Sequence, residues 1–503
     1  MTLARALILA GLIAAARAGA AEISTADTQA ASSPATQRLS VAEAVMIGLE
    51  NNRSLRVERF NVDIQRTFEQ EERAAFLPVA AAGVARAAAD SVELSSGGLV
   101  TNLGRNATAG NAGLSAYLPT GTRVDIGADT TLRRLSEQGP QLDALRARVA
   151  LTQSLLQGFG SAANLARLRE ARLDTRMSRY ELRGFAEALV GRIEQSYWDL
   201  YLARERIAIF EDSLRLAVSQ LAETRERIRI GTTAQVELAA AQAEVASRRQ
   251  QLISARGAQE TAGLRLLDLL STRGADTGER AIELTEKPSA LDLNLGPVAA
   301  HVQVALTMRP DLNQARLLAE RNELEVVRTR NGMLPKLDLF VSLGRTGYAD
   351  SFNRSVREVS DGLSDTAVGA TFSWPLGNGA EQARHARAVL SGEQTREALS
   401  NLSQAVELDV RSAYVAFATA SEQVSATAAT RQLREESYRA ERGKFGVGKS
   451  TSLLVAQAQR DLLLTRLGEA QAVAAQRQSL VDLLRLEGTL LQRRGISVAG
   501  DGE

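Results

Sequence analysis

The chain repeats itself at a separation of 257 residues, because residues 49–78 align with residues 306–335 without a gap. The matched residues are Leu49, Leu55, Arg59, Arg73, Leu77 and Pro78 in the first copy and Leu306, Leu312, Arg316, Arg330, Leu334 and Pro335 in the second. Internal similarity at a fixed separation is the sequence signature of a repeated structural unit. We therefore interpret the 503 residues as two copies of one unit.

Each unit combines helices with a strand-like region. A helix is expected over 39–75, with Ser40 as its N-cap and Glu43 at the capping-box spacing. Proline disfavours helix at the preceding residue, so Leu77-Pro78 ends it. Helical periodicity returns over 161–228 and 234–270, and in the second unit over 310–333, 380–442 and 452–486. Runs of this length without caps are typical of coiled-coil-like hairpins, here with tips near Gly231 and Gly448, at equivalent places in the two units.

Alternating apolar and polar residues predict strands between the helices. The apolar members are Val124, Ile126 and Ala128, Val149, Leu151 and Leu155, Leu337, Leu339, Val341 and Leu343, and Val368, Ala370, Phe372 and Trp374, with 79–89 a weaker candidate. A soluble sheet and an outer-membrane strand share this pattern. About two strands per unit cannot close a barrel, and open edges are not tolerated in lipid. A membrane location would therefore require several copies to join their strands.

The N-terminus favours export, since Arg5, an apolar run over 6–16 and Ala18-Gly19-Ala20 resemble a secretory signal with its cleavage site. The alternative is an ordinary N-terminal helix. The absence of Cys excludes disulfides, thiolate metal sites and a Cys nucleophile. The 60 basic and 59 acidic residues do not indicate a nucleic-acid partner. No residue cluster indicates catalysis, so we expect neither an enzyme nor a cofactor or metal.

The segment Gly443–Ser450 fits the phosphate-binding pattern G-x-x-x-x-G-K-S. That loop binds phosphate only between a buried strand and a helix. Here it follows about 60 residues of helical pattern, and the equivalent turn near Gly231 lacks the lysine. We interpret it as a turn between two helices.

The order of these features resembles the TolC-like family of outer-membrane efflux channels. The resemblance rests on the duplicated Leu-Pro steps, on Ser154–Gly160 and Ser373–Gly379 where strand returns to helix, and on the tips at 229–233 and 446–450. It implies a mainly α-helical homotrimer, with a β-barrel in the outer membrane of a Gram-negative bacterium and a helical barrel in the periplasm. The implied partners are outer-membrane lipid, a periplasmic adaptor (membrane fusion protein) and an inner-membrane pump.

The expected organisation of the chain follows the two units. It consists of a signal peptide (1–20), a flexible linker (21–38), the first repeat (39–270), an equatorial connector (271–296), the second repeat (297–488) and a tail (489–503). The first repeat departs from the family's usual four strands per subunit. The interval from Pro78 to Gly158 is longer by 38 positions than that from Pro335 to Gly377, and the excess contains the turn Leu118–Gly121. This insert either adds a hairpin to the barrel wall or forms an appendage.

The resemblance also implies roles at the tips. The residues expected to meet the adaptor are Arg225, Arg227, Gly231, Arg442, Lys444 and Gly448, and those expected at the pore or gate are Glu237, Phe445, Leu454 and Gln457. Three copies of Glu237 would form an anionic ring favouring cations. Leu454 replaces the equivalent acid in the second repeat, which weakens that expectation.

These features predict a passive export duct of a tripartite efflux or type I secretion system, gated at its periplasmic tip. A soluble periplasmic coiled-coil scaffold without a pore is the alternative, and a motor built on the apparent phosphate loop is a third. The sequence leaves the cargo and the class of pump open.

Overall fold

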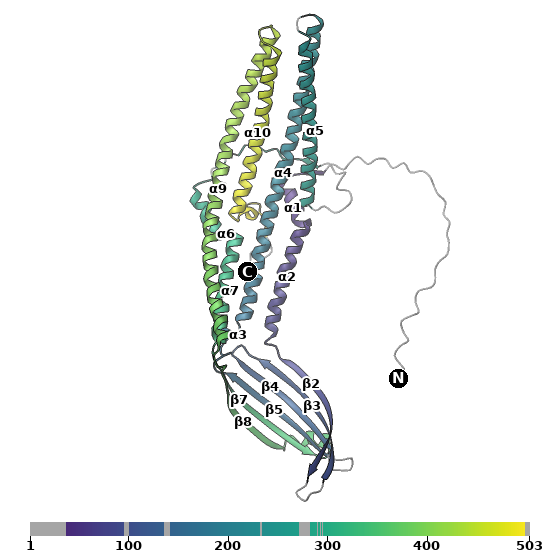
Figure 1. Ribbon diagram of the computed structural model, residues 1–503, viewed down its shortest axis with the longest axis vertical. Helices are drawn as coiled ribbons and strands as arrows, with labels where there is room; N and C mark the ends of the chain where they lie inside the picture. Colours follow the sequence, from purple (N-terminus) through teal and green to yellow (C-terminus); the bar gives the residue numbers. More distant parts are fainter. Residues whose placement is uncertain are drawn as a thin grey trace, which may run out of the picture.

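Helices and strands occupy opposite ends of an elongated molecule in the computed structural model (Figure 1). The structure describes residues 37–94, 100–134, 141–231, 234–270, 282–288 and 295–497, together with 290, 291 and 293. The predicted signal peptide lies outside these residues. Within them, no helix combines the length and the apolar character needed to cross a membrane.

The first half of the chain forms the elements β1 (Gln37–Leu39), α1 (Val41–Asn51), α2 (Arg53–Ala74), β2 (Val79–Leu94), β3 (Val100–Tyr117), β4 (Thr122–Arg134), β5 (Gln141–Ser154), α3 (Ser161–Asn164), α4 (Ala166–Arg229) and α5 (Val236–Leu270). The predicted capping box is present, because Ser40 Oγ accepts from Glu43 N and the Glu43 carboxylate accepts from Ser40 N. The helix predicted over 39–75 is broken at Asn52, whose side chain caps α2 through Leu55 N, 3.1 Å away.

The second half forms β6 (Ile282–Leu284), α6 (Val298–Met308), α7 (Pro310–Gly332), β7 (Lys336–Ala349), α8 (Phe352–Glu358), β8 (Leu363–Ser373), α9 (Gly379–Gly446), α10 (Ser452–Leu486) and α11 (Leu490–Arg493). Helices α2, α4, α7 and α9 lie side by side in that order, and α5 and α10 fold back along α4 and α9. The 64 residues of α4 make a rod about 96 Å long.

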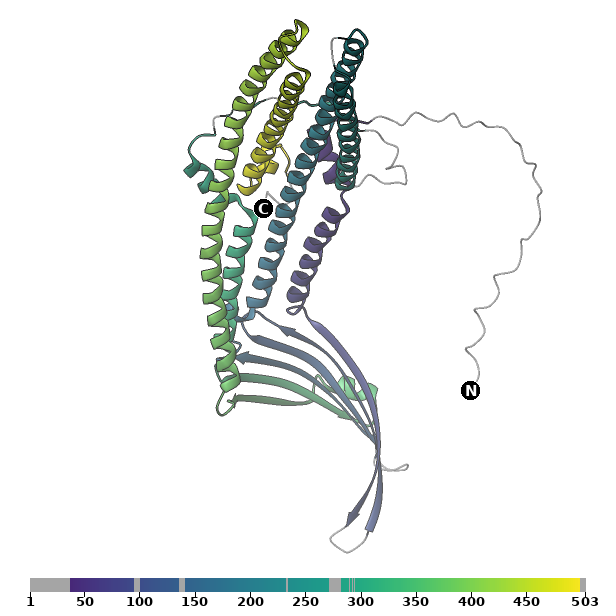
Figure 2. The same ribbon diagram turned by 45° about the horizontal axis from the view of Figure 1, so that its top comes forward.

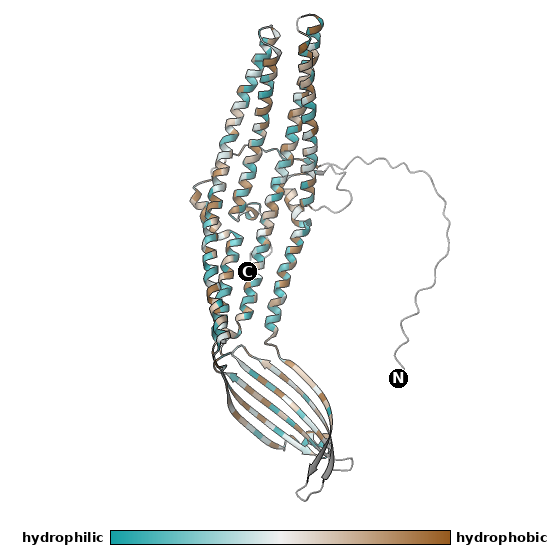
Figure 3. Ribbon diagram, in the orientation of Figure 1, coloured by the Kyte–Doolittle hydropathy of each residue, from teal (hydrophilic) through white to brown (hydrophobic). Residues whose placement is uncertain are grey.

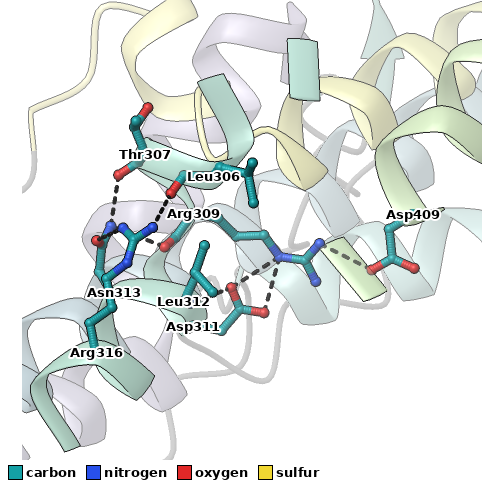
Figure 4. A network of polar contacts seen from close by, with 8 residues as sticks. All are labelled: Leu306, Thr307, Arg309, Asp311, Leu312, Asn313, Arg316 and Asp409. Carbon is teal, nitrogen blue, oxygen red and sulfur yellow. Dashed lines mark hydrogen bonds and ion pairs between the residues drawn. The ribbon is translucent and has the colours of Figure 1, made fainter. Parts of the chain in front are cut away.

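Contacts at the breaks between short helices recur in both copies of the repeat. Arg316 donates to Leu306 O at 2.8 Å, and its equivalent in the first copy, Arg59, donates to Leu49 O at 3.4 Å. In the second half, Arg309 ties the α6–α7 break to its neighbours. Its guanidinium donates to Asp311 and to Asp409 of α9, each at 3.0 Å (Figure 4).

The helical body has its main core at mid-height, where α1, α4 and α5 meet the tail. Tyr197, Leu189 and Ile193 of α4 are fully buried there with Leu490 and Leu491. The tail is therefore part of the core, which the sequence pattern did not predict. Nor did it predict that residue 37, placed in a flexible linker, would begin a strand, since β1 pairs in parallel with β6.

One antiparallel sheet contains six strands in the order β2-β3-β4-β5-β7-β8. The expectation of about two strands per unit is wrong for the first unit, which contributes four. The weak candidate over 79–89 is a full strand of 16 residues, because its small residues pair along the whole of β3. Its alanines and glycine gave too little hydrophobic alternation to show this length. The insert forms the β3–β4 hairpin, and the strands curve away from the helices (Figure 2).

The two faces of the sheet differ in polarity, and the strands show both colours in alternation (Figure 3). One face carries apolar side chains in register from strand to strand, for example Leu114, Ile126, Val149, Leu343 and Val368. These five side chains are 47–68% exposed. The other face carries polar side chains that include Asn111, Asp129, Arg146, Arg148 and Asp365. This alternation fits lipid on one side and water on the other.

Candidate functional site at the helical tips

Each helical hairpin ends in a turn built around one glycine. Gly231 follows α4 and Gly448 follows α9, and both have φ of +75° with no other atom near enough to contact an added Cβ. Glycine adopts this left-handed conformation without steric cost. Gly448 N donates to Phe445 O at 3.1 Å and Lys449 N donates to Lys444 O at 2.8 Å, the pair of bonds of a Schellman cap. The second tip is thus a defined turn at the predicted Gly448, and in the first tip α4 ends just before the predicted Gly231.

The apparent phosphate loop is such a turn. Helix α9 runs through Gly443 to Gly446, and α10 begins at Ser452 with Thr451 as its N-cap. The segment is preceded by a helix and not by a buried strand, so the arrangement required for phosphate binding is not formed. The interpretation of Gly443–Ser450 as a helix-to-helix turn is confirmed.

Two of the four predicted tip cations form ion pairs along their own helices. Arg227 lies 2.8 Å from Glu223, and Lys444 lies 3.2 Å from Glu441. Arg225 and Arg442 are exposed at the surface of α4 and α9. Solvent-exposed pairs of this kind contribute at most about 1 kcal/mol each. Arg225, Arg442 and Lys444 therefore remain accessible to a partner, whereas the Arg227 side chain is only 25% exposed.

The two tips meet through Arg227 and Phe445. The Arg227 guanidinium carbon lies 4.2 Å from the centre of the Phe445 ring, within the range of a cation–π contact. Phe445 also packs against the buried cluster of Tyr438, Val455 and Leu462, which holds the ring on the second hairpin. A residue of the predicted docking surface and one of the predicted gate therefore lie in one contact between hairpins.

The remaining predicted gate residues lie in the first turns of the returning helices. Glu237 is half-buried in the first turn of α5. Leu454 and Gln457 are exposed near the start of α10, and Leu454 N donates to the capping Thr451 hydroxyl at 3.4 Å. The structure thus places all ten predicted residues at or beside the two tips. Their roles in docking and gating stay predictions.

Ion pairs between the arms of each hairpin are functional candidates that sequence reasoning missed. Arg434 of α9 lies 3.0 Å from Asp461 of α10, and Arg431 lies 2.5 Å from Glu469. In the first hairpin, Arg256 of α5 lies 3.0 Å from Glu211 of α4. These pairs join residues on different helices, so spacing along one helix gave no signal for them. They add to the packing between the two arms of each hairpin, by at most about 1 kcal/mol for each exposed pair.

A polar cavity lies where the sheet meets the helices. Its volume is about 1230 Å³, and its lining comes from β3, β4, β5 and β7 together with α4, α7 and α9. Arg123, Asp125 and Asp338 line it from the polar face of the sheet, and Arg167 and Arg387 line it from the helices. The polar face of the sheet and the helical body therefore line one polar cavity together.

Comparison with known proteins agrees with this architecture. Residues 301–489 match the outer membrane efflux protein family. A curated relative, the proteases secretion protein PrtF of Dickeya chrysanthemi, is 23% identical over 358 residues, covering 69% of this chain and 74% of that protein.

Solved structures share the fold over almost the whole chain. The Campylobacter jejuni CmeC outer membrane channel has a TM-score of 0.66 and 16% identity, with 90% of this chain and 86% of that chain covered. The outer membrane protein VceC of Vibrio cholerae has a TM-score of 0.64 and 15% identity, with 89% and 96% covered. The resemblance to TolC-like outer-membrane channels is thereby confirmed. So are the outer-membrane location and the general class of an efflux or secretion duct, and a soluble scaffold is not favoured.

Proposed function

We propose that three copies of this chain form one passive duct from the periplasm through the outer membrane. The observation that carries the proposal is the six-stranded sheet, with an apolar and a polar face and with β2 and β8 at its two edges. In the described residues each edge strand has only one neighbour. Unpaired backbone groups cost several kcal/mol each in lipid, so β2 of one copy would pair with β8 of the next.

Exposed apolar stripes on the outer helices support the same head-to-tail arrangement. On α2, Val57, Phe60, Ile64 and Phe68 are 48–66% exposed and recur at every third or fourth position. On α9, Leu390, Leu408, Val415 and Leu433 are 62–66% exposed, at intervals close to whole numbers of helical turns, so they share one helix face. Helix α2 lies beside the β2 edge and α9 beside the β8 edge (Figure 1). A closed ring would bring the two stripes together.

We propose that the duct is gated at its helical tips and coupled there to partners. The tip turns and the Arg227–Phe445 contact lie at the end opposite the sheet, which supports a gate there. The family resemblance supports a periplasmic adaptor and an inner-membrane pump as partners, with energy supplied by the pump. The channel itself then needs no catalytic site. PrtF suggests protein secretion as one cargo class, beside efflux of small solutes.

Two measurements test the duct. Outer-membrane fractions should contain an oligomer that dissociates on heating, and the purified oligomer should conduct ions in a planar bilayer. A stable monomer without conductance would refute the duct. Because the chain has no native cysteine, cysteines introduced at neighbouring tips within 225–231 and 442–450 report on the gate. Their oxidation should block transport, whereas undiminished export after confirmed crosslinking would show that the gate lies elsewhere.

A further inference from the structure

We infer that the β3–β4 hairpin widens the membrane part of the duct beyond a barrel built from four strands per subunit, and so suits the exit to polymeric cargo such as polypeptide chains. The inference rests on the proposed trimeric duct. It concerns the segment Val100–Arg134, which contains both inserted strands and the turn between them.

The hairpin belongs to the wall of the sheet. Strand β3 pairs with β2 from Val100 to Ser115, and β4 pairs with β5 from Thr122 to Arg134. Its side chains follow the polarity of their neighbours, since Leu114 and Ile126 lie on the apolar face and Asn111 and Asp129 on the polar face. In β4 the alternation runs from Arg123 to Leu132, whereas in β3 it is confined to the part near the helices, because Asn106 and Thr108 share the face of Leu114. An appendage lying in the lumen or outside the cell would need neither this alternation nor the pairing along both neighbouring strands.

The turn of the hairpin is fixed to the point where strand returns to helix. Gly160 N donates to Thr120 O at 3.2 Å, and Ser154 N donates to Gly121 O at 3.1 Å. Asn164 donates to Pro119 O at 3.1 Å and accepts from the Tyr117 hydroxyl at 3.1 Å. At Gly121, whose φ is +90°, an added Cβ would lie 2.2 Å from Gly158 O. These bonds fix the hairpin in position at the rim of the helical body.

The hairpin brings no helix with it. In each subunit α2 leads into β2, β5 leads through α3 into α4, α7 leads into β7, and β8 leads into α9. Four strands therefore continue into helices, whereas β3 and β4 are joined to each other at this end by residues 118–121. Each copy contributes six strands to a barrel that stands on only four helical connections.

The width of the barrel follows from the number of its strands. Six strands from each of three copies make eighteen, against twelve without the hairpin. Barrel diameter grows roughly linearly with strand number, so the hairpin makes the barrel about half as wide again. Barrels of 16–18 strands leave an aqueous channel. A tilted strand takes up about two-thirds of the width of a packed helix, so eighteen strands match a ring of twelve helices, whereas twelve strands would narrow the exit. The outer-membrane part is then a wide mouth that continues the helical tunnel without a constriction.

Polymer exclusion measures the mouth. Poly(ethylene glycol) of increasing size is added to the extracellular side of single channels in a planar bilayer. The native protein is compared with a variant lacking 100–134, in which the flanking residues connect β2 to β5. We expect the largest polymer that enters from this side to be about a third smaller in radius for the deletion variant. An equal cut-off for two conducting channels would overturn the inference, whereas no conductance from the native protein would instead refute the duct.

Single-cysteine variants test the inference if the deletion variant does not assemble. Asn111→Cys lies on the polar face of β3 and Leu114→Cys on the apolar face, and no native cysteine interferes. A water-soluble maleimide–poly(ethylene glycol) applied to intact cells should label Asn111→Cys and leave Leu114→Cys unlabelled. Labelling of both positions, or of neither while an extracellular-loop cysteine reacts, would show that the hairpin does not line a wide mouth.

Discussion

The guanidinium of Arg227 lies 4.2 Å from the ring centre of Phe445, and this contact joins the tip of the first hairpin to that of the second. Arg227 is also held by Glu223 of its own helix, and Phe445 by the apolar cluster beneath the second tip. Each partner is thus positioned before the two hairpins meet. Separating the hairpins would break the contact without unfolding either one, which is the property that a latch requires.

Loss of this contact should favour the open tip. A partly exposed cation–π contact contributes about 0.5–1 kcal/mol, so Arg227→Ala and Phe445→Ala should each shift the closed–open equilibrium about two- to five-fold per subunit. Single-channel open probability measures the shift. The double variant should exceed neither single variant by much, because one contact is lost in all three. Arg225→Ala, which removes an exposed cation from the same helix end, is the matched control and should leave open probability unchanged.

Phe445→Ala also opens space in the apolar cluster beneath the tip, so Phe445→Leu separates packing from ring chemistry. This variant keeps an apolar side chain but removes the aromatic face. Its open probability should resemble that of Phe445→Ala. Behaviour like that of the native protein would mean that packing, and not the contact with Arg227, holds the tips together.

Substitution of a tip glycine should destabilise the turn only where the glycine has a positive φ. Gly448→Ala places a Cβ at φ +75° and should destabilise the turn by about 1–2 kcal/mol. Gly446→Ala is the control, because Gly446 is the last residue of α9 and alanine favours helix. Hydrogen exchange of 440–455 should accelerate in Gly448→Ala and not in Gly446→Ala. Equal protection in both variants would mean that the turn does not need glycine at position 448.

The outer apolar stripes should be needed for assembly. Phe60 is 66% exposed on α2, and Leu408 is 66% exposed on α9. Burying a large apolar side chain contributes about 1.5–3 kcal/mol, and three equivalent contacts form in a trimer. Phe60→Ser and Leu408→Ser should therefore weaken the oligomer, seen as a lower dissociation temperature in semi-denaturing gels. Asn61→Ser, one position along α2, should not change it, and an unaffected Phe60→Ser oligomer would exclude this face from the interface.

Stability of the helical body should fall as pH rises from about 4.5 to about 7. Burial raises the pKa of the Glu187 carboxyl to about 7, although Arg183 at 3.5 Å opposes the rise. The folded state then binds a proton that the unfolded state has released, so folding is favoured below this window and loses that contribution above it. The full difference amounts to at most about 3 kcal/mol. Glu187→Gln should flatten the pH dependence of the detergent-solubilised protein's thermal midpoint, whereas an unchanged slope would assign it to other groups.

The sequence predicted those features that repeat regular patterns. Helix ends were predicted where a local signal exists, such as the Ser40 capping box and the prolines at 78 and 335. The tips were predicted because glycine is needed at a positive φ. The length of β2 was underestimated because its many alanines do not alternate with polar residues. Such small side chains still allow close pairing with β3. Contacts between distant segments, such as Leu490 in the core or Arg227 on Phe445, have no local pattern.

Two tyrosines at equivalent places in the repeats should contribute differently to stability. Tyr197 is fully buried, and its hydroxyl donates to Leu39 O at 3.0 Å and accepts from Glu286 N at 3.2 Å, tying β1 and β6 to α4. Tyr414, at the equivalent place in the second repeat, makes one bond at a more exposed site, to Gly296 O at 2.9 Å. Tyr197→Phe removes two hydrogen bonds, although Leu39 O still accepts from Thr285 N, and should cost about 1–3 kcal/mol, against less than about 1 kcal/mol for Tyr414→Phe. The rate of hydrogen exchange at 282–288 should rise in Tyr197→Phe alone. Equal effects of the two substitutions would mean that the two tyrosine hydroxyls contribute equally to stability.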